Sequence, residues 1–372
     1  MGDTKKSDPK LAALPTPNSS LIELCDAKLL RAIDALYQQL DTAPQRVAIA
    51  LSGGVDSAAL ALHASVWAQQ RGIRLLCFHV HHGLQQVADS WLQHVQSLAS
   101  LLSIPCEVQR VQVDLGQGDG MESAARTARY QAFADMAKRS AVSHVFLAHH
   151  QDDQAETVLL RLLRGSGPSG LGAMAPLSQR QELMYLRPWL DVPRSRIKQI
   201  GGLMAQHLGW QPVEDVTNHQ DDYTRGALRE RLTPHLNERW QGWQKVLVRH
   251  AQLSRETSQV LTEVAQHDLQ SLDWQLSDGS FSLKAWRELS AARQALVLRY
   301  WLEQAGLKMP TEARLADLMR QMRQLHALGF DRQMQVKHGD HLIVCARGRV
   351  ILQRHNETVL TAAQRKSGKS VE

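Results

Sequence analysis

The chain has 372 residues, of which 43% are hydrophobic, and it carries a formal net charge of +6. It is long enough for two or three domains, and none of its apolar runs approaches the roughly 20 residues of a membrane-spanning helix. The surplus of positive charge permits a polyanionic partner without establishing one.

The start of the chain and its cysteines narrow the class further. Residues 1–20 are polar, contain three prolines and lack the apolar core of a secretory signal, so we predict a disordered leader over residues 1–25. The four cysteines form no Cys-x-x-Cys pair, which argues against a zinc knuckle or an iron–sulfur cluster. Scattered free thiols are typical of a reducing compartment, and we predict a cytoplasmic protein.

The first strand–turn–helix pattern contains a pair of glycines. An apolar strand is predicted over Val47–Leu51 and a helix over Ala58–Gln70. Adjacent glycines let backbone N–H groups face an anion, and the helix start adds its positive dipole end. A carboxylate beside phosphates indicates bound Mg²⁺, here on Asp56. We therefore predict a loop that binds a Mg²⁺-bound polyphosphate, formed by Ser52, Gly53, Gly54, Val55, Asp56 and Ser57.

Two widespread phosphate-binding loops fit this turn less well. A Walker A loop needs a lysine that is missing here, and a dinucleotide fingerprint needs three spaced glycines. An ordinary strand-to-helix turn is the remaining alternative.

Strands and helices alternate through the first half of the chain. Further strands are predicted over Arg74–Val80, Cys106–Val113, His144–Ala148 and within Met184–Trp189, and further helices over Val87–Leu102, Met121–Arg139 and Asp153–Arg164. This order predicts an α/β fold, a Rossmann-like parallel sheet with helices on both faces. Ligands of such sheets bind beyond the carboxyl ends of the strands, where the polar motifs of this chain fall.

Three histidines lie at the end of the second strand. Alternation along the strand directs His79 and His81 to one side and His82 to the other. Because no cysteine lies nearby, we expect the lining of an adenine pocket or ordinary hydrogen bonding in preference to structural zinc. His79 is therefore a candidate ATP-binding residue.

Two pairs of charged residues each share a helical face. Arg126 and Arg129 suit phosphate recognition, and the alternative is that they are exposed residues of an amphipathic helix. Asp153 and Glu156 follow His149 and His150, and the two carboxylates suit Mg²⁺, a cationic substrate or a proton. Helix capping accounts for one acid but not for two histidines and a second acid.

The alternation stops near Thr224. We predict a catalytic domain over residues 26–223, a helical linker over 224–272, a small α+β domain over 273–355 and a flexible tail over 356–372. Gly165–Gly172 is predicted to be a mobile loop, either a lid or a connector. Two basic clusters are each either a polyanion contact or a solvated helix face: Arg187, Arg194, Arg196 and Lys198, then Arg225, Arg229, Arg231 and Arg239.

These motifs together resemble the tRNA(Ile)-lysidine synthetase family. Ser52–Ser57 resembles the PP-loop of the ATP pyrophosphatase superfamily, and the further matches follow in the same order: His79–Leu84, Ala125–Tyr130, His149–Thr157, Arg187–Trp189, Glu214–Asn218 and Tyr223–Arg225. The likeness is dense from about residue 45 to residue 236 and weak in the C-terminal part. The chain departs from the family pattern at His81, Gln85 and Gly226, where the family commonly has Asn, Arg and Asn.

The resemblance implies an enzyme that uses ATP and Mg²⁺ to join L-lysine to the wobble cytidine of CAU-anticodon tRNA(Ile), through an adenylated cytidine. The product, lysidine, switches decoding and aminoacylation from methionine to isoleucine. The resemblance also admits a homodimer. The implied catalytic residues are Asp56, Arg129, His149, Asp153 and Glu156, with a carboxylate or His149 taking the proton of the lysine amine. The implied substrate-binding residues are Arg126, Arg129, Asp153, Glu156, Arg187 and Arg225.

Two other functions stay open. Another PP-loop tRNA-modifying enzyme, such as a thiolase, would need thiols near the loop. A non-catalytic RNA-binding protein on an ATPase scaffold would lack ATP–pyrophosphate exchange.

Overall fold

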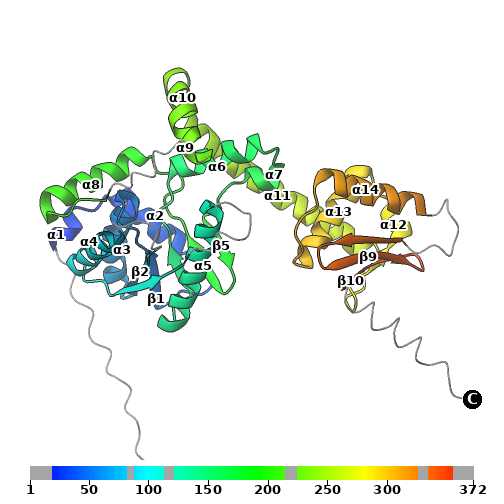
Figure 1. The fold of residues 1–372 in the computed structure, drawn as a ribbon, viewed down its shortest axis with the longest axis horizontal. Coiled ribbons are helices and arrows are strands. Elements are labelled where there is room, and N and C mark those ends of the chain that lie inside the picture. Colours follow the sequence, from blue (N-terminus) through cyan, green and yellow to red (C-terminus); the bar gives the residue numbers. More distant parts are fainter. Residues whose placement is uncertain (1–18, 82–87, 113–120, 214–223, 326–333, 355–372) are drawn as a thin grey trace, which may run out of the picture. The chain divides into compact units, whose positions relative to one another are not determined.

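The protein is described from a computed structural model, and the described residues are 19–81, 88–112, 121–213, 224–325 and 334–354. The chain divides into two compact units, an N-terminal unit, Met1–Ser254, and a C-terminal unit, Arg255–Glu372 (Figure 1). In the N-terminal unit the elements are α1 (Ser19–Glu23), α2 (Ala27–Tyr37), β1 (Arg46–Ala50), α3 (Val55–Arg71), β2 (Arg74–His81), α4 (Ala88–Leu101), β3 (Cys106–Arg110), α5 (Met121–Ser140), β4 (His144–Phe146), α6 (Gln151–Leu163), α7 (Pro168–Leu171), β5 (Leu177–Arg180), β6 (Leu183–Leu186), α8 (Arg194–Leu208), α9 (Thr224–Ala227), the π-helical turn η2 (Leu228–Leu232) and α10 (Thr233–Arg239).

The sheet of the N-terminal unit has the strand order β3-β2-β1-β4-β6-β5. Strand β1 lies in the middle and pairs in parallel with β2 and with β4, while β5 pairs antiparallel to β6. The predicted parallel α/β fold is therefore confirmed, with β5 as an antiparallel edge strand that the sequence did not indicate. Because β1 and β4 are neighbours, the loops after them meet at the same edge of the sheet.

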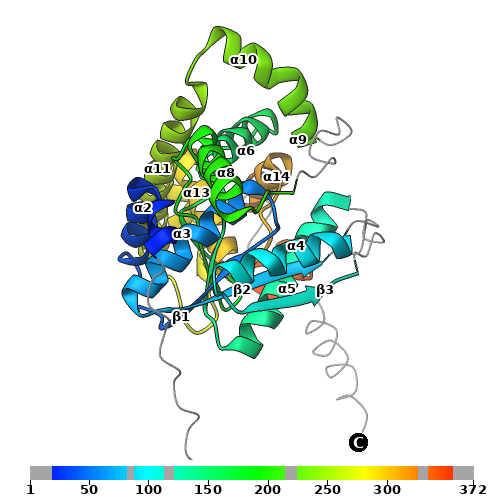
Figure 2. The same ribbon diagram turned by 90° about the vertical axis from the view of Figure 1, so that its left-hand side faces the viewer.

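Alternation along β1 sends side chains into two separate cores. Val47 and Ile49 pack with α2, α3, α4 and α8, whereas Ala48 packs with α5. Figure 2 shows α4 and α5 on opposite sides of the β2–β3 edge. The sheet is thus covered on both faces, as a parallel sheet requires.

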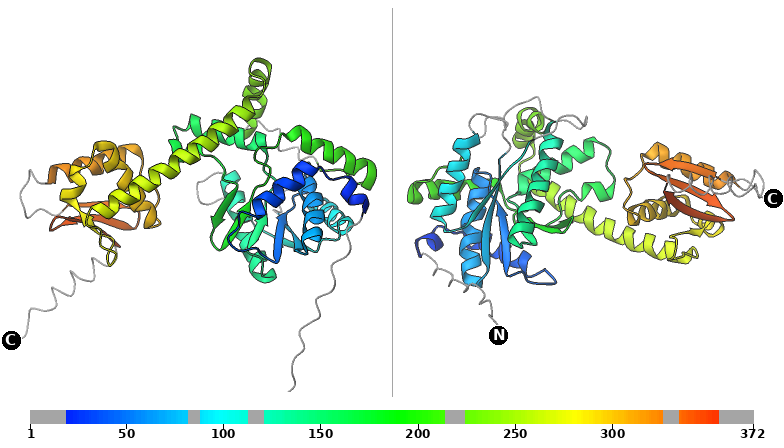
Figure 3. Two further views of the ribbon diagram at one scale, coloured as in Figure 1. Left: turned by 180° about the vertical axis from the view of Figure 1, so that it is seen from behind. Right: turned by 60° about the horizontal axis from the view of Figure 1, so that its bottom comes forward.

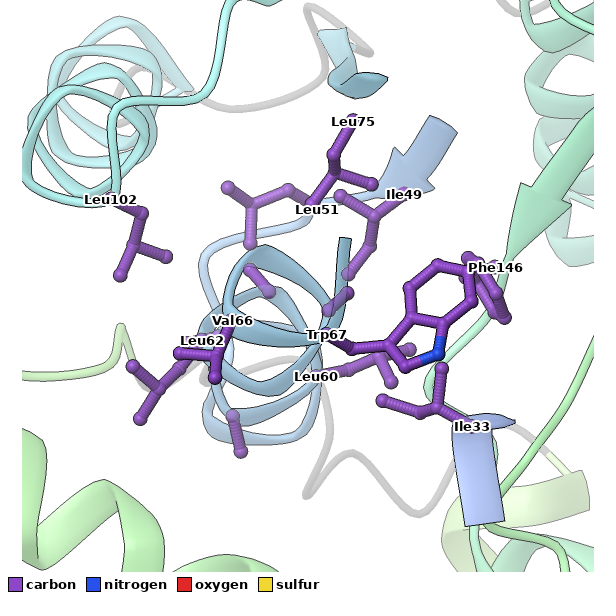
Figure 4. Close-up of a cluster of buried hydrophobic side chains, with 14 of the residues drawn as sticks. Ile33, Ile49, Leu51, Leu60, Leu62, Val66, Trp67, Leu75, Leu102 and Phe146 are labelled. Atoms are coloured by element: carbon purple, nitrogen blue, oxygen red, sulfur yellow. The ribbon is translucent and has the colours of Figure 1, made fainter. Parts of the chain in front are cut away.

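Helix α3 is buried along most of its length. Small and aliphatic side chains let it pack against β1 and β2 and between α2 and α8. Trp67 lies edge-on to Phe146, with ring centroids 5.6 Å apart (Figure 4). The indole N–H of Trp67 donates to Asp34 Oδ1 at 3.0 Å. This packing fixes the C-terminal half of α3, while the N-terminus of α3 follows the glycine-containing turn after β1.

Two sequence predictions need correction here. Helix α1 lies inside the predicted disordered leader, and its Leu21 and the following Leu24 are buried in the main core, so the leader prediction is wrong for residues 19–25. The short apolar stretch was too brief to show helical periodicity. Residues 1–18 and the predicted tail from 356 lie outside the described residues.

The predicted mobile loop at Gly165–Gly172 contains α7 and is tied to α6. Gln154 is fully buried and exchanges two hydrogen bonds with the backbone of Met174, at 2.8 and 3.0 Å. Arg161 donates to the carbonyl oxygens of Gly170 and Ala173. The segment is therefore a connector whose backbone is tied to α6, although α7 itself buries no side chain.

The C-terminal unit contains a four-stranded antiparallel sheet of order β7-β10-β9-β8 with helices packed against it (Figure 3). Trp286 and Phe281 lie at its buried centre. Its elements are α12 (Leu283–Glu288), α13 (Ala291–Gln304), α14 (Glu312–Gln324), β7 (Phe281–Ser282), β8 (Met334–His338), β9 (His341–Ala346) and β10 (Arg349–Arg354). The predicted small α+β unit is confirmed.

One long helix, α11 (Trp243–Ser271), runs across the division between the two units. The predicted linker over 224–272 is accordingly helical in α9, η2, α10 and α11, but the division falls at residue 254 and not at its ends. Gly226 and Leu228 at its start are buried within the N-terminal unit. None of the helices in the described ranges has the length and apolar character needed to cross a bilayer.

Candidate active site

The glycine turn after β1 is shaped to receive an anion. Gly53 has φ +94, a conformation that side-chain-bearing residues rarely adopt, and a Cβ there would lie 3.2 Å from Val95 Cγ2. Gly54 is the N-cap of α3 and offers no side chain to the N–H groups of the first helical turn. These N–H groups are the donors that a phosphate would accept from.

The two serines of the turn bond to each other and hold its shape. The Oγ atoms of Ser52 and Ser57 lie 3.1 Å apart, and Ser57 Oγ donates to Gly54 O at 3.0 Å. From outside the turn, Val213 N–H donates to Gly53 O at 3.0 Å. The turn is therefore braced on both sides of its glycines.

Asp56 has the features of a cation ligand. Its side chain is 25% exposed, and its Oδ1 atom is buried without a hydrogen-bond partner in the described part of the chain. Its Oδ2 atom lies 3.5 Å from an Arg194 nitrogen. A buried carboxylate oxygen that lacks a donor is costly unless a cation meets it, so the residues present fit Mg²⁺ at this position.

The acidic helix entrance is built by His150. His150 is the N-cap of α6, and its Nδ1 accepts from Asp153 N–H while Asp153 Oδ2 accepts from His150 N–H at 3.1 Å. The other ring nitrogen, Nε2, lies 3.6 Å from Asp56 Oδ2 and 3.4 Å from Asp153 Oδ2. One imidazole therefore joins the glycine turn to the acidic helix in a single site.

The charges around His150 act on its protonation. Burial alone would lower the pKa of His150, but the hydrogen bond to Asp56 and the charges of Asp153 and Asp56 raise it above its ordinary value. The family resemblance implied the neighbouring His149 as a catalytic residue and did not single out His150.

His149 is in a different environment. Burial lowers the pKa of His149 to about 3, and the charges of Arg187, Arg126 and Arg225 act in the same direction. Its Nδ1 atom is buried and has no partner among the described residues. His149 is thus neutral at physiological pH, and so low a pKa makes it a weak acceptor for the proton of an amine.

The two predicted carboxylates, Asp153 and Glu156, form ion pairs with arginines of the same chain. Glu156, which is 5% exposed, accepts two hydrogen bonds from the guanidinium of Arg229, at 2.6 and 2.9 Å. The same guanidinium lies 3.4 Å from Asp153 Oδ1, and Arg225 Nε lies 3.2 Å from Glu156 Oε2. Arg229 therefore lies closer to Glu156 than to Asp153. Arg229 was absent from the predicted site, although it belongs to the second basic cluster.

The predicted arginine contacts divide into two kinds. Arg126 and Arg129 are exposed on α5, as expected of residues that meet a large anion. Arg187 is only 6% exposed and donates to Ala175 O and Ser178 Oγ, at 3.0 and 2.7 Å. Its surroundings contradict the expectation of a surface tRNA contact, because its guanidinium holds the segment before β5.

Other members of the basic clusters are also paired with acids. Arg194 faces Asp56, Arg196 pairs with Asp26, and Arg225 donates to Thr157 Oγ1 at 3.0 Å beside Glu156. These residues are therefore partly neutralised by acids of the same chain.

His79 supports the end of β1. The His79 ring is 5% exposed and its Nδ1 lies 2.8 Å from Leu51 O, while burial lowers its pKa. His81 Nε2 lies 3.2 Å from Asp89 Oδ1. His82 and Gln85, and the segments Glu214–Asn218 and Tyr223, lie outside the described residues. No cluster of three or more metal-ligating His, Cys, Asp or Glu side chains occurs within the described residues.

The cysteines lie away from these groups. Cys77 and Cys106 are register partners in β2 and β3 with their sulfur atoms 3.3 Å apart, inside the sheet. Burial raises the pKa of Cys25 to about 12. Cys345 is buried in the C-terminal unit. None of the four thiols, all of which lie in the described ranges, contacts the acids of the site.

Comparison with known proteins now adds to this geometry. A family model of the PP-loop domain matches residues 25–236, and a model of the TilS substrate binding domain matches residues 281–351. A tRNA(Ile)-lysidine synthase from Bordetella bronchiseptica is 52% identical over 338 residues, which cover 91% of this chain and 97% of that protein. One from Ralstonia nicotianae is 40% identical over 278 residues, 74% of this chain and 58% of that protein.

A solved structure with a similar fold is a U34-tRNA thiolase from Methanococcus maripaludis with its [4Fe-4S] cluster. The TM-score is 0.51 at 16% identity, over 63% of this chain and 79% of that chain, so the likeness concerns the fold alone. The likeness to the lysidine synthases covers much more of the chain. The PP-loop model spans more than half of the sequence, and the model of the TilS substrate binding domain matches the part that follows. Because the identity to a tRNA(Ile)-lysidine synthase is also 52% over 91% of this chain, the chain belongs to the tRNA(Ile)-lysidine synthase family.

Proposed function

We propose that this protein joins free L-lysine to the wobble cytidine of the CAU-anticodon isoleucine tRNA, with ATP as the energy source. The observation that carries the proposal is the position of His150, which lies within 3.6 Å of Asp56 and 3.4 Å of Asp153. A nucleotide held by the glycine turn and a cation held by the acidic helix would therefore meet in one place. Close placement of two reactants supplies much of the rate of such a reaction.

The first step is proposed at the glycine turn. The backbone N–H groups of residues 53–57 and the N-terminus of α3 would hold the triphosphate of ATP, and Asp56 would hold Mg²⁺. Bound Mg²⁺ would neutralise phosphate charge. The carbonyl oxygen of the cytosine forms a bond to the α-phosphorus, and the bond from that phosphorus to the bridging oxygen breaks, releasing pyrophosphate. The chain's own contribution is to position and to neutralise.

The second step is proposed at the acidic helix. Asp153 and Glu156 bind the cationic lysine, and their affinity for a cation is supported by the guanidinium that they hold. The amine of lysine then forms a bond to the adenylated carbon of the base, and AMP leaves. An amine with a free pKa of about 10.4 must first lose a proton. His149, with a pKa of about 3, is a poor recipient, which argues against its predicted role as the base.

The decisive experiment is transfer of radiolabelled lysine to the isoleucine tRNA transcript with a CAU anticodon, in the presence of ATP and Mg²⁺. Elongator methionine tRNA, which shares the anticodon, is the control. We expect label in the first tRNA and none in the second. No incorporation into either tRNA would contradict the proposal.

The thiolase alternative has its own test. Replacement of Cys25, Cys77, Cys106 and Cys345 by Ser should leave lysine transfer intact, whereas a sulfur-transferring enzyme would lose activity. No observation on the site favours sulfur chemistry, since none of these thiols contacts its acids.

A further inference from the structure

Beside the candidate active site, four arginines form a group next to Tyr130, in which Arg126 and Arg180 lie over the ring and the charge of Arg126 acts on Arg161 and Arg187. They come from four segments: α5, α6, β5 and the stretch after β6. They are Arg126, Arg161, Arg180 and Arg187. Only Arg126 among them belonged to a predicted phosphate-binding pair, and Arg180 carried no signal in the sequence.

Tyr130 is a fixed platform. Its ring is 7% exposed and meets Tyr185 edge-on with centroids 5.0 Å apart, and Phe133 supports it at 6.2 Å. A ring held by two aromatic neighbours keeps its face and hydroxyl in one orientation. Groups that stack on it are therefore oriented as well.

Two exposed guanidinium groups use this platform. Arg180 Cζ lies 4.3 Å from the centroid of the Tyr130 ring, and Arg126 Cζ lies 5.2 Å from it. An Arg126 nitrogen also donates to the Tyr130 hydroxyl at 3.3 Å. Stacking of a guanidinium on an aromatic ring leaves its edge N–H groups free for hydrogen bonds.

The positive charge of this group lacks an acidic partner in the part of the chain that the structure describes. Within the described residues, none of the four arginines forms an ion pair with a carboxylate, in contrast to Arg194, Arg225 and Arg229. Arg161 and Arg187 donate to backbone carbonyls and a serine. Repulsion from Arg126 contributes to lowering the pKa of both Arg161 and Arg187, after the larger effect of burial.

We propose that Arg126 and Arg180, aligned by Tyr130, form a clamp for a backbone phosphate of the RNA strand next to the target cytidine. The clamp rests on the proposed function, because it needs an RNA substrate. It borders the active site, since Tyr130 meets Tyr185 of β6, and β6 pairs in parallel with β4, the strand that leads to His149 and His150. A cytidine splayed into the site needs its flanking phosphates held, and guanidinium forks match phosphate oxygens.

The ATP phosphates are the other source of the same chemistry. They have their own cradle at the N-terminus of α3, which packs on the opposite face of the sheet from α5. The RNA backbone is therefore the favoured occupant, and the experiment separates the two sources.

The test compares Arg180→Ala with Arg31→Ala, which removes the same charge from an exposed position on α2. The probe is the CAU-anticodon isoleucine tRNA transcript, bound in filter assays over a range of salt. Arg180→Ala should bind about tenfold more weakly, and the slope of log affinity against log salt should shrink by about 0.7, one single-strand phosphate. The KM values for ATP and lysine should not change.

Arg180→Lys keeps the charge but loses the flat stacking on Tyr130. It should retain the salt slope and recover only part of the affinity. Thermal melts of all three variants establish that each is folded.

Three results would overturn the clamp. The first is an equal loss of tRNA affinity in Arg180→Ala and Arg31→Ala. The second is an unchanged salt slope in Arg180→Ala. The third is a raised KM for ATP in Arg180→Ala with normal tRNA binding, which would assign the site to the nucleotide. The binding readout does not need catalysis. If only the clamp proposal is wrong, the wild-type protein still transfers lysine to saturating tRNA. If the proposed function is wrong, the wild-type protein transfers no lysine, whatever the salt dependence of tRNA binding.

Discussion

At the scale of single residues, His150 uses its two ring nitrogens for different purposes. Nδ1 accepts from a backbone N–H at the start of α6, so the hydrogen of the neutral ring is assigned to Nε2 by the hydrogen-bond pattern. That hydrogen faces the carboxylates of Asp56 and Asp153. The residue thereby caps a helix and aligns two acids that follow different strands of the sheet.

Asp56 is the residue on which adenylation should depend most. Asn at this position keeps the shape but loses the charge that a metal ion needs. We expect Asp56→Asn to lower tRNA-dependent ATP–pyrophosphate exchange by at least about 100-fold, while tRNA affinity stays within about twofold.

Asp152→Asn is the matched control, because Asp152 lies on the first turn of α6 and forms no ion pair with any described residue. Normal exchange in Asp56→Asn, or loss of tRNA affinity alone, would remove Asp56 from its assigned role.

Glu156 tests the binding of lysine. Glu156→Gln preserves the side-chain length but leaves Arg229 and Arg225 facing a neutral amide. We expect the KM for lysine to rise at least about tenfold with little change in the KM for ATP, since a buried charge partner has been removed. Glu182→Gln, in the exposed turn before β6, is the control. An unaltered KM for lysine would show that the acid binds only arginine.

At the scale of elements, His63 ties the start of α2 to α3. The ring is fully buried, its Nδ1 lies 2.7 Å from Ala59 O, and its Nε2 accepts from Asp26 N–H at 2.9 Å. Both nitrogens are used only when the ring is neutral. Burial accordingly lowers the pKa of His63 to about 4.

Folding should therefore be acid-sensitive through His63. The unfolded chain takes up a proton at the ordinary pKa of about 6.5 and the folded chain only near 4, so stability falls as the pH drops through this window. The full loss below pH 4 is on the order of 3 kcal/mol. Urea unfolding of the wild type and of His63→Gln across this pH range measures it. Parallel stability curves for the two proteins would contradict the assignment.

Helices α3 and α8 approach closely at Gly201. A Cβ at this position would lie 2.4 Å from Val55 Cγ2, and Val55 is the first residue of α3 after the glycine turn. Gly202, the next residue, is exposed and has nothing within 4 Å of such a Cβ. The two glycines form a natural matched pair.

Alanine should have opposite effects at these two positions. Gly202→Ala should stabilise the protein by up to about 1 kcal/mol through helix propensity. Gly201→Ala should destabilise it by about 1–3 kcal/mol through overpacking and should raise the KM for ATP by displacing the turn. Denaturant unfolding and ATP kinetics provide the measurement, and equal behaviour of both variants would argue against a steric role for this contact.

At the scale of the whole molecule, the sequence predicted more of the fold than of the site. Alternating apolar runs were enough for β1 to β4 and for α3 to α6, because each is bounded by turn residues. They were not enough for α1, β5 or α12, which are short and owe their structure to packing. Within the site, Asp56 and the acidic pair were visible as motifs, whereas Arg229 and Arg180 are brought there only by tertiary structure.

Binding of tRNA should respond strongly to ionic strength. The net charge is +6, and the arginines around Tyr130 have no acidic partner in the described residues. If three single-strand phosphates are neutralised, affinity should fall roughly 20-fold between about 50 and 200 mM salt. Filter binding over this range measures the slope, with an unrelated tRNA as the reference for nonspecific affinity. A flat response would exclude the basic surface as the site of RNA contact.

Because β1 and β4 are neighbours in the sheet, the site should tolerate insertions and deletions in the segments between them. The two strands lie side by side, yet most of the catalytic domain's first half separates them along the chain. Insertions or deletions in those intervening connections leave the distance between Asp56 and His150 untouched, since that distance is set by hydrogen bonds across one strand pair. Changes in the length of those connections should therefore affect the reaction little, whereas a slip of one residue in the β1–β4 pairing would turn the side chains of the shifted strand to the other face of the sheet.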